Sequence, residues 1–462
     1  MSKFKTALML TLLLALAATL SVSAQGPDSY TTGFQVANLA DTEAQIAIEF
    51  VDKNGTVVDT LDDQIPANEA NTYYPLPADV PAGFDGSVVI SSDQPLAAIT
   101  NVLGTEGDTV GDFGGADYTG LNQTSDQVFI PQVMNNYFGI FTWFNVQNAG
   151  NQPVEVTVNY TGNLGSCSEG PVTIPAKAAH TFDQSQTSAA CVTAGFLGAA
   201  TVQATNDTDE IVATVMQYND QSLLAYNGFA TNGAPELVIP FVSQQWYNSR
   251  TGIQMQNTGT QATNVTLTFY PSEGFPGQQC TQTLAIPAGG STKFADTELF
   301  GTGNCGPMSG ANQANYGFVG SAAVTANSTN QPLVGIVNTI TTGTPNGADY
   351  NAAIPTEATS MVTFPQIMDR YFGIFTGFSV ANVGTQQTEV TCTFVNSPLV
   401  VNQLVDPGAA LTHVQLNEIA DGYNGAATCT ASGGDAMIVG IVSQLGGVPG
   451  ADQLLYYEGA NH

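Results

Sequence analysis

Basic residues are what this sequence most lacks. Its 462 residues include 7 Lys and Arg against 38 Asp and Glu, a formal net charge of −31 at pH 7. A surface of this sign repels phosphate backbones, which makes nucleic acid a poor partner and disfavours anionic membranes. Divalent cations, or a salty medium that screens the repulsion, are its natural counterparts.

Charge of either sign is also scarce, since only 10% of the residues are charged. The chain is therefore unlike an acidic disordered segment, which carries far more charge. Gly, Asn, Thr, Gln, Val and Ala dominate instead, a composition typical of β-strands joined by tight turns. No segment beyond the N-terminus has a convincing helical period. We expect an all-β protein.

Long apolar runs are missing except near the N-terminus. Lys3 and Lys5 precede the run TALMLTLLLALAATLSV, and Val22-Ser23-Ala24 fits a small-residue cleavage site. This pattern predicts a cleaved signal peptide over residues 1–24, with export and no membrane span in the mature chain. A retained membrane anchor is the disfavoured alternative, because the run is short for a spanning helix. The mature chain would carry five basic and 38 acidic residues, a net charge of −33.

One short motif recurs four times along the chain. The copies are GFQVANLAD, WFNVQNAGN, GIQMQNTGT and GFSVANVGT, centred on Asn38, Asn148, Asn257 and Asn382. A turn, an alternating strand, a Pro-containing turn, an aromatic-x-Gly signal and two further strands follow each Asn. Alternation of period two indicates strands with one buried face. The predicted organisation is four tandem antiparallel β-sandwich domains over residues 25–124, 125–234, 235–358 and 359–462.

The first copy departs from the others in two ways. Ala40 stands where the other copies have Gly, which predicts a different turn. Gln25 aligns with Asn135, so the mature chain has no match for residues 128–131 and the first sandwich lacks its first strand. An exposed sheet edge would result, and such an edge invites strand addition at an assembly end. Alternatively, this strand is dispensable.

Six cysteines allow 15 pairings. The repeat alignment selects one of them, in which each bridge stays inside its own copy. The pairs are Cys167–Cys191, Cys280–Cys305 and Cys392–Cys429. The last pair replaces apolar core residues of the other copies, which predicts that its two strands face each other across the core. Free buried thiols are the alternative, but export to an oxidising compartment favours bridges.

The sequence of turn, alternating strand, Ile-Pro-Ala turn, Phe-x-Gly signal and apolar strand resembles the immunoglobulin-like modules of secreted bacterial surface proteins. These include S-layer-type and adhesin-type arrays. The resemblance covers residues 28–459, with departures at Ala40 and at residues 406–408. It implies immunoglobulin-like sandwiches, an extracellular or cell-surface location and a structural or adhesive role.

Two groups of residues are candidates for a site. Asp108, Asp112 and Asp117 lie in a Gly-Asp loop and could offer oxygen ligands to Ca²⁺, with a solvated turn as the favoured alternative. Phe141 and Trp143 fall on the outward face of their strand, and Phe375 matches Phe141 in the fourth copy. Packing against a neighbouring domain is the favoured interpretation of this face, and carbohydrate binding is the alternative.

The sequence contains only three histidines and none of the common nucleophile, zinc or phosphate motifs, so we expect no enzyme and no cofactor beyond a possible Ca²⁺. The leading prediction is an exported structural protein. In it, a rod of sandwiches would build a surface layer, filament or stalk with itself or with other surface components. An adhesin or glycan-binding protein is the alternative, and a hydrolase with an unrecognised site is disfavoured.

Overall fold

The computed structural model describes residues 27–77, 79–107, 111–294, 305–306, 317–328, 330–446 and 452–462. The predicted signal peptide and Asp108 lie outside these residues. Within them the regular structure is β except for two 3₁₀ turns, η1 (Trp246–Asn248) and η3 (Pro355–Glu357), so the all-β prediction is confirmed. The described residues include no helix that is long and apolar enough to cross a membrane.

The strands fall into four successive modules. Module 1 contains β1 (Ser29–Asn38), β2 (Ala44–Asp52), β3 (Val57–Ile65), β4 (Ala70–Tyr73), β5 (Gly86–Ser92), β6 (Leu96–Thr105) and β7 (Gly114–Thr119). Module 2 contains β8 (Gln127–Asn135), β9 (Phe141–Asn148), β10 (Val154–Gly162), β11 (Gly165–Ile174), β12 (Ala179–Asp183), β13 (Phe196–Ala204), β14 (Ile211–Tyr218) and β15 (Leu223–Asn227). Module 3 contains β16 (Glu236–Gln244), β17 (Ser249–Asn257), β18 (Thr263–Pro271), β19 (Cys280–Ile286), β20 (Ser291–Phe294), β21 (Phe318–Ala326), β22 (Leu333–Thr341) and β23 (Gly347–Asn351). Module 4 contains β24 (Met361–Tyr371), β25 (Ile374–Asn382), β26 (Thr388–Phe394), β27 (Val400–Val405), β28 (Ala410–Val414), β29 (Tyr423–Ser432), β30 (Ile438–Gly446), β31 (Leu454–Glu458) and β32 (Ala460–Asn461).

Each module is a β-sandwich of two antiparallel sheets. In module 2 the outer sheet has the order β11-β10-β13-β8 and the inner sheet the order β12-β9-β14-β15. Modules 3 and 4 repeat this order, and in module 4 the pairing of β24 with β25 joins the two sheets. Module 1 has the inner sheet β4-β1-β6-β7, but its outer sheet, β3-β2-β5, has only three described strands.

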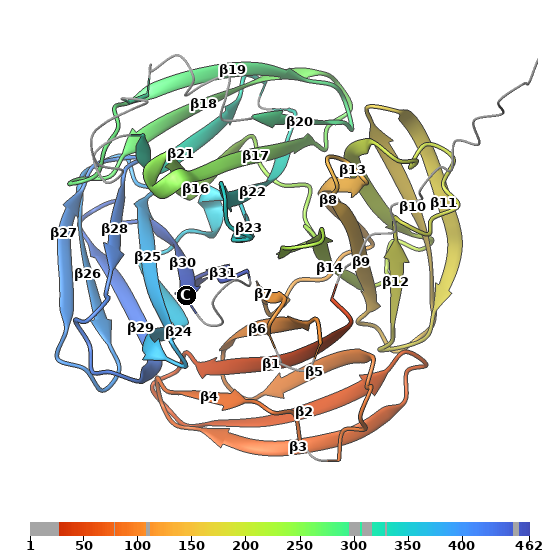
Figure 1. Cartoon of the computed structure of the whole chain (residues 1–462), viewed down its shortest axis with the longest axis horizontal. Coiled ribbons are helices and arrows are strands. Elements are labelled where there is room, and N and C mark those ends of the chain that lie inside the picture. Colours follow the sequence, from red (N-terminus) through yellow and green to blue (C-terminus); the bar gives the residue numbers. More distant parts are fainter. Residues whose placement is uncertain are drawn as a thin grey trace, which may run out of the picture.

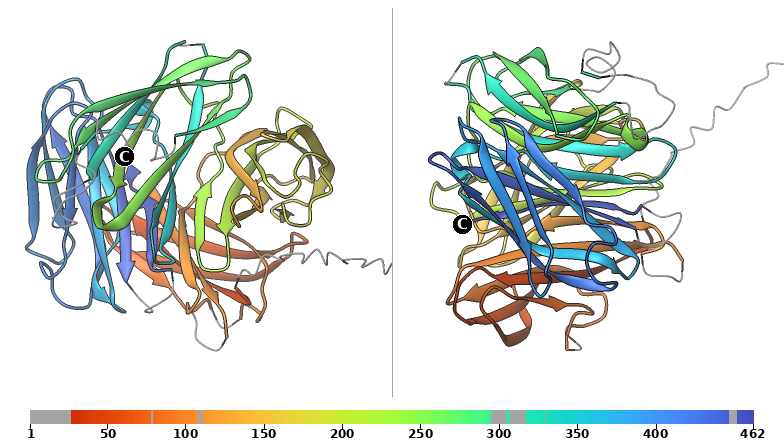
Figure 2. Two further views of the ribbon diagram at one scale, coloured as in Figure 1. Left: turned by 45° about the horizontal axis from the view of Figure 1, so that its top comes forward. Right: turned by 90° about the vertical axis from the view of Figure 1, so that its left-hand side faces the viewer.

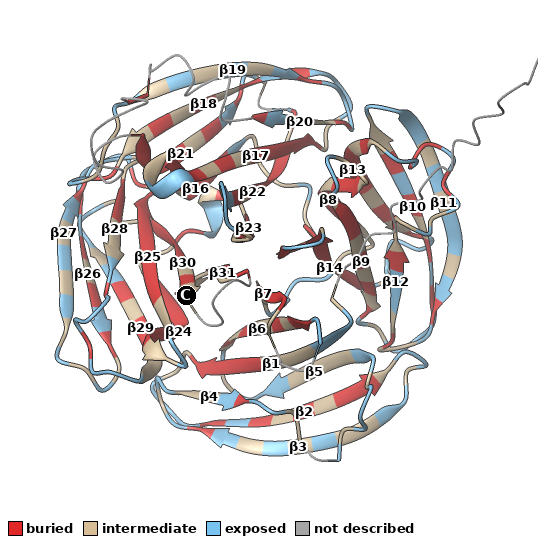
Figure 3. Ribbon diagram, viewed as in Figure 1, coloured by how far each residue is buried: buried red, intermediate tan, exposed pale blue. Residues whose placement is uncertain are grey.

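Apolar residues alternate along the strands, and those on one face form the core between the two sheets of each sandwich. In β10, Val156, Val158 and Tyr160 are buried between the sheets, and the residues between them are wholly or partly exposed. In the outermost strands β3, β11, β19 and β27, every residue except the buried last one is wholly or partly exposed (Figure 3).

The repeated Asn links two turns in every module. The amide of Asn148 donates to the carbonyls of Gln152 and Ile174 at 2.7 and 3.1 Å, and its Oδ1 accepts the N–H of Gly150 at 2.9 Å. Asn38, Asn257 and Asn382 repeat this pattern. In module 1 the N–H of Ala40, which stands in the place of the glycine, donates to Asn38 Oδ1 at 2.9 Å. The three glycines have no positive φ, so the prediction of a different first turn is wrong.

The modules close into a ring rather than extending as a rod (Figures 1 and 2). The first strand of each complete module packs on the inner sheet of the next. Thus β8 lies against β17 and β22, β16 against β25 and β30, and β24 against β1 and β6 of module 1. The predicted rod is therefore wrong. The physical reason is that inner strands such as β14 and β25 carry almost continuous buried runs, so both faces of the inner sheet must be covered.

The last inner strand of each module lies at the ring centre. Strands β7, β15, β23 and β31 contact one another in turn around the axis (Figure 1). Polar groups at their C-terminal ends close a cycle. Asn227 donates to Thr119 Oγ1 at 2.8 Å, Asn351 donates to the Asn227 carbonyl at 2.7 Å, and Glu458 accepts the N–H of Asn351 at 2.5 Å. The hydroxyl of Thr119 reaches Glu458 Oε2 at 3.4 Å, which completes the cycle through all four modules.

At the N-terminal ends of the inner strands, one carboxylate joins the modules. Asp452 accepts the N–H groups of Leu223, Gly347 and Leu454 at 3.2, 2.9 and 3.3 Å, from modules 2, 3 and 4. Its own N–H donates to the carbonyl of Phe113 in module 1 at 3.2 Å. The side chain of Asp452 is buried, so these hydrogen bonds lie away from water.

Three disulfides join the cysteines in the pairs that the repeats indicate, Cys167–Cys191, Cys280–Cys305 and Cys392–Cys429. The placement predicted for the third pair is wrong. Cys392 and Cys429 are direct partners on β26 and β29, neighbouring strands of one sheet, and do not face each other across the core. In the other modules the same two positions form an apolar cross-strand pair, such as Val158 with Val202.

Candidate functional site

The hairpin between the first two strands of modules 2, 3 and 4 is the most distinctive surface feature of the ring. In module 2, Tyr137 and Ile140 exchange two backbone hydrogen bonds of 3.0 and 3.1 Å. Phe138 and Gly139 therefore form a two-residue turn, with φ of 51° and 83°. Module 4 repeats it at Phe372 and Gly373, with φ of 51° and 80°.

Module 3 places an aromatic residue at the same position, although η1 replaces the simple turn. Tyr247 has a φ of 49° and follows Trp246. The aromatic rings at the three tips are exposed to solvent: Phe138 is 86% exposed, Phe372 80% and Tyr247 52%. An exposed aromatic ring at the tip is thus common to all three modules.

This conformation is unfavourable for an aromatic residue. Two-residue hairpin turns with positive φ at both central positions favour Asn-Gly, and a bulky residue in the left-handed region costs about 1–2 kcal/mol. Phe138 and Phe372 gain little burial in return, because most of each side chain faces water. Strained residues of this kind cluster at functional sites, so their repetition in equivalent turns makes these hairpins candidates for a function.

Each tip residue is paired with the aromatic residue before it. The ring centroids are 4.7 Å apart for Tyr137 and Phe138, 4.8 Å for Trp246 and Tyr247, and 4.6 Å for Tyr371 and Phe372. All three pairs are edge-to-face. We call these six residues the hairpin face.

The rare basic residues of the chain gather at these hairpins. Lys293, on β20 of module 3, reaches across to module 2, where its ammonium donates to the Tyr137 hydroxyl at 3.0 Å. The same ammonium lies 5.2 Å from the Tyr137 ring centroid, within cation–π range. Arg250 follows the module 3 hairpin closely in the sequence. Together with Arg370, three of the five basic residues beyond the predicted signal peptide belong to this region.

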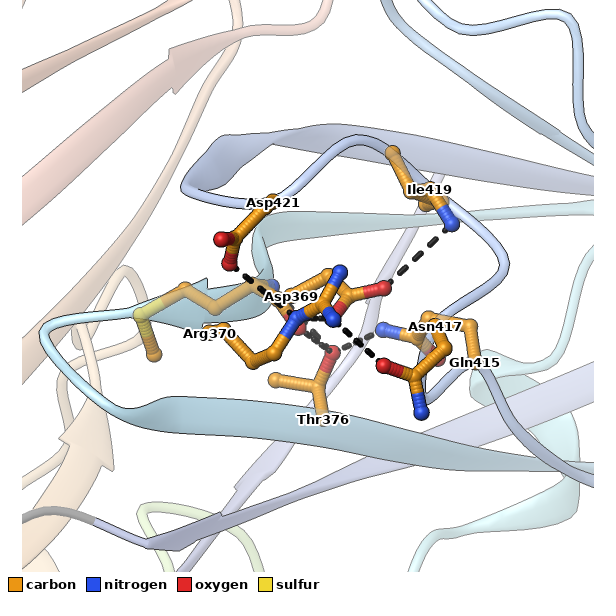
Figure 4. Close-up of polar contacts among 8 residues, drawn as sticks. Asp369, Arg370, Thr376, Gln415, Asn417, Ile419 and Asp421 are labelled. Carbon is orange, nitrogen blue, oxygen red and sulfur yellow. Dashed lines mark hydrogen bonds and ion pairs between the residues drawn. The ribbon is translucent and has the colours of Figure 1, made fainter.

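In module 4, Arg370 braces the hairpin (Figure 4). Its Nε lies 3.0 Å from the buried Asp369 and 3.1 Å from the exposed Asp421, and its NH1 group donates to Asn417. Asp369 in turn accepts the N–H of Ile419 at 3.3 Å. These contacts tie the hairpin to the loop that follows β28 and hold it in one position.

The three hairpins lie on one face of the ring. They occupy equivalent positions in modules that follow one another by rotation about the central axis (Figure 1). Rotation about an axis leaves equivalent points at the same height along it, so the three tips project from the same side. The fourth position, in module 1, has Asp28 in place of the aromatic residue.

The aromatic residues singled out from the sequence lie elsewhere. Trp143 packs edge-on against Tyr30 of module 1, with ring centroids 6.3 Å apart, and Phe141 stacks on Tyr218 at 5.8 Å. Both belong to an apolar cluster between modules 1 and 2. Phe375 is half-buried on β25, opposite residues of β24 and β30. The available signal for the hairpin face was the Tyr-Phe-Gly-Ile segment shared by the second and fourth copies.

Of the three predicted calcium ligands, only Asp112 and Asp117 belong to the described residues, so the calcium site stays a prediction. Asp112 accepts the N–H of Glu106 at 2.7 Å in the turn before β7, and Asp117 is buried on β7 at the ring centre. Among the described residues, no three His, Cys, Asp or Glu side chains are placed to hold a metal ion.

The ring centre contains buried carboxyl groups whose pKa values are raised. Burial raises the pKa of Asp117 well above its usual value, and the charge of Glu458 adds to this shift. Burial likewise raises the pKa of Asp349, against an opposing hydrogen bond from Asn338, and that of Glu458. A carboxyl with a raised folded-state pKa stabilises the fold fully below its unfolded pKa, near 4. This stabilisation is lost as the pH rises toward the folded-state value.

We therefore expect a lower melting temperature at pH 8 than at pH 5. Repulsion among the many acidic residues also lowers the melting temperature as the pH rises. A variant is therefore needed to separate the two causes. Asp349→Asn removes one buried titrating group and should flatten the dependence of melting temperature on pH, measured by thermal unfolding between pH 4.5 and 8. An equal pH dependence in the variant and the native protein would show that Asp349 does not contribute to it.

No protein-family model matches the chain, and no curated protein does. Among solved structures, 27% of the chain is similar to 97% of a chain in the crystal structure of Thermotoga maritima 1070. The sequence identity is 14% and the TM-score 0.20. A TM-score this low supports no argument about the fold or the function.

Proposed function

We propose that this protein is a non-enzymatic, exported binding protein that attaches to a neutral polysaccharide through the hairpin face. One observation carries the proposal: three modules hold an exposed aromatic residue in a left-handed turn, at φ of 49° to 51°. Such turns accept Asn or Gly more easily, so folding alone gives no reason for the rings.

The chemistry of the face favours sugar rings. Exposed aromatic rings are apolar platforms, and the C–H faces of pyranose rings can pack on them. The cations beside them have partners within the protein, since Lys293 contacts Tyr137 and Arg370 contacts Asp369 and Asp421. They therefore brace the hairpins and add little attraction for anions. The large negative charge of the chain further disfavours a polyanionic ligand.

The ring supplies multivalency. Three platforms on one rigid face can contact one polymer or one surface, which raises the effective concentration for the second and third contacts. The closed cycle through Thr119, Asn227, Asn351 and Glu458 holds the modules together. A preorganised array loses less entropy on binding than a flexible rod of modules.

Export and a cell-surface location belong to the same proposal. Three disulfides are consistent with an oxidising, extracellular environment. The immunoglobulin-like character of the modules is proposed with it, supported by the two-sheet strand order that modules 2 to 4 share.

Fluorescence titration with polysaccharides tests the proposal. Trp246 adjoins Tyr247 on the hairpin face, and Trp143 is the only other tryptophan, so Trp143→Phe leaves a single reporter at the face. Neutral polysaccharides should shift or quench its emission in a saturable way, and polyanionic ones should have little effect. The absence of any response across a broad panel of neutral glycans would contradict the proposal.

A second candidate function uses the same face for assembly. Phe138 and Phe372 are the most exposed large apolar side chains among the described residues, and burying them between two rings would remove apolar area from water. Sedimentation velocity separates the two functions. Concentration-dependent dimers without glycan would favour assembly, whereas monomers that bind glycan would favour attachment.

A further inference from the structure

The outer sheet of module 1 ends in an unpaired strand. In module 2, β13 pairs with β10 on one side and with the first strand, β8, on the other. Strands β21 and β29 are flanked in the same way in modules 3 and 4. The matching strand of module 1, β5, pairs with β2, and no described strand lies along its other edge.

The core beneath this edge is open as well. Val88 and Ile90 on β5 are only half-buried. Their counterparts in module 2, Ala200 and Val202, are at most 1% exposed. The difference arises because β8 pairs along the edge beside the module 2 pair, whereas no described strand pairs with the matching edge of β5, where the Ser87 hydroxyl donates to the Lys177 carbonyl of module 2 at 3.0 Å.

A tyrosine marks the same position in every module. The hydroxyls of Tyr226, Tyr350 and Tyr457 each contact both backbone groups of one residue on their module's first strand, just after a Pro. These tyrosines are at most 1% exposed. Tyr118, their counterpart in module 1, is half-exposed and has no first strand among the described residues to contact.

The adjacent module offers a further contact. At two complete seams, a polar side chain of the next module donates to the carbonyl of that Pro. Ser379 Oγ donates to Pro240 at 2.8 Å, and Gln35 Nε2 donates to Pro365 at 3.0 Å. The equivalent residue at the seam between modules 1 and 2 is Asn145. It is half-exposed, and its Oδ1 accepts a hydrogen bond from Thr181 at 2.5 Å, so its amide N–H groups are the donors that this side chain can offer.

We propose that this seam is a binding site for an extended segment of another protein chain, which adds as a strand antiparallel to β5. The three complete modules define its chemistry: three residues before a Pro, of which at least the first and third are apolar. Their segments are Val128-Phe129-Ile130-Pro131, Leu237-Val238-Ile239-Pro240 and Val362-Thr363-Phe364-Pro365. All three are already paired within their own modules, so none of them is free to fill the seam. Backbone hydrogen bonds to β5 supply the affinity, and the apolar side chains over Val88 and Ile90 supply the specificity.

The site is tested with a peptide of residues 127–135, QVFIPQVMN, added to the purified, secreted full chain. Fluorescence anisotropy should show saturable one-to-one binding, and a peptide with Asp in place of Ile130 should bind at least tenfold more weakly. Hydrogen exchange at the β5 amides should slow when the peptide binds. Val88→Asp should weaken binding, whereas the matched variant Val57→Asp, on an exposed position of β3, should not.

Two results would overturn the proposal. One is the absence of binding by the native peptide. The other is strong protection, before any peptide is added, of the β5 amides that do not bond to β2, which would mean that the chain's own N-terminal residues or a second copy fills the seam. The exchange measurement uses the unmodified protein, so the test stands even if Val88→Asp fails to fold.

Discussion

Replacing Asp452 by alanine is expected to lower the free energy of unfolding by about 3–5 kcal/mol and to loosen the ring at its centre. The carboxylate accepts backbone N–H groups from β15, β23 and β31, which belong to three different modules. Truncation leaves these donors buried without an acceptor, at a cost of about 1–3 kcal/mol for each group. Because the three strands share one acceptor, the separate costs do not simply add.

A graded pair of variants strengthens this test. Asp452→Asn keeps Oδ1, which accepts the N–H groups of Gly347 and Leu454. It replaces Oδ2, which accepts the N–H of Leu223. It should therefore cost less than the alanine variant, about 1–3 kcal/mol. Urea unfolding measures both, with Asp207→Ala at an exposed turn position as the control for the loss of one aspartate side chain. Equal stability of Asp452→Ala and Asp207→Ala would show that the central carboxylate does not hold the modules together.

The second large effect concerns binding. The double variant Phe138→Asn, Phe372→Asn should lose about 100-fold or more in apparent affinity for the polysaccharide while remaining folded. It removes two of the three aromatic platforms, and the loss of multivalent contacts weakens avidity by factors of about 10²–10⁴. Titration of the immobilised glycan with the native and variant proteins measures this loss.

Stability should move little in the same variant. Asn adopts positive φ easily, so each substitution relieves strain of about 1–2 kcal/mol. It also removes an edge-to-face ring pair worth about 0.5–1.5 kcal/mol. The two effects nearly cancel, and the melting temperature should stay the same or rise.

Two controls separate the role of the rings from general damage. Phe138→Tyr, Phe372→Tyr keeps both platforms and should keep binding. Phe141→Asn alters a buried ring two positions beyond the Phe138–Gly139 turn and should destabilise the fold by several kcal/mol, as large core truncations do. Native-like glycan binding by the Asn double variant would rule out the hairpin face as the attachment site.

Local patterns predicted the fold of each module well. Alternating residues such as Val156, Val158 and Tyr160 face the core as expected, because the period of a strand depends only on the backbone. The repeat alignment paired the cysteines, since equivalent positions in homologous strands are neighbours. It misplaced Cys392 and Cys429 across the core, because an apolar pair in an alignment does not distinguish strands of one sheet from strands of facing sheets.

The candidate site was harder to predict. Phe141 and Trp143 were correctly assigned to the face away from the core of module 2, but that face packs against module 1. Phe138, three residues before Phe141, is not among the residues that the sequence singles out. Its exposure depends on a tight turn with positive φ, which Asn or Gly usually adopts. The residue preferences of such turns therefore did not predict an aromatic residue at the tip.

The sequence by itself determined the repeated β-sandwich modules and their disulfide pairs, because repeats, alternation and turn residues act over short distances. Only the tertiary structure decided that the modules form a ring. Closure depends on contacts between residues more than 100 positions apart, such as Asn351 with Asn227 and Glu458. These contacts leave no periodic signal along the chain. The ring in turn buries the aromatic face of module 2 and carries the three hairpin tips on one side.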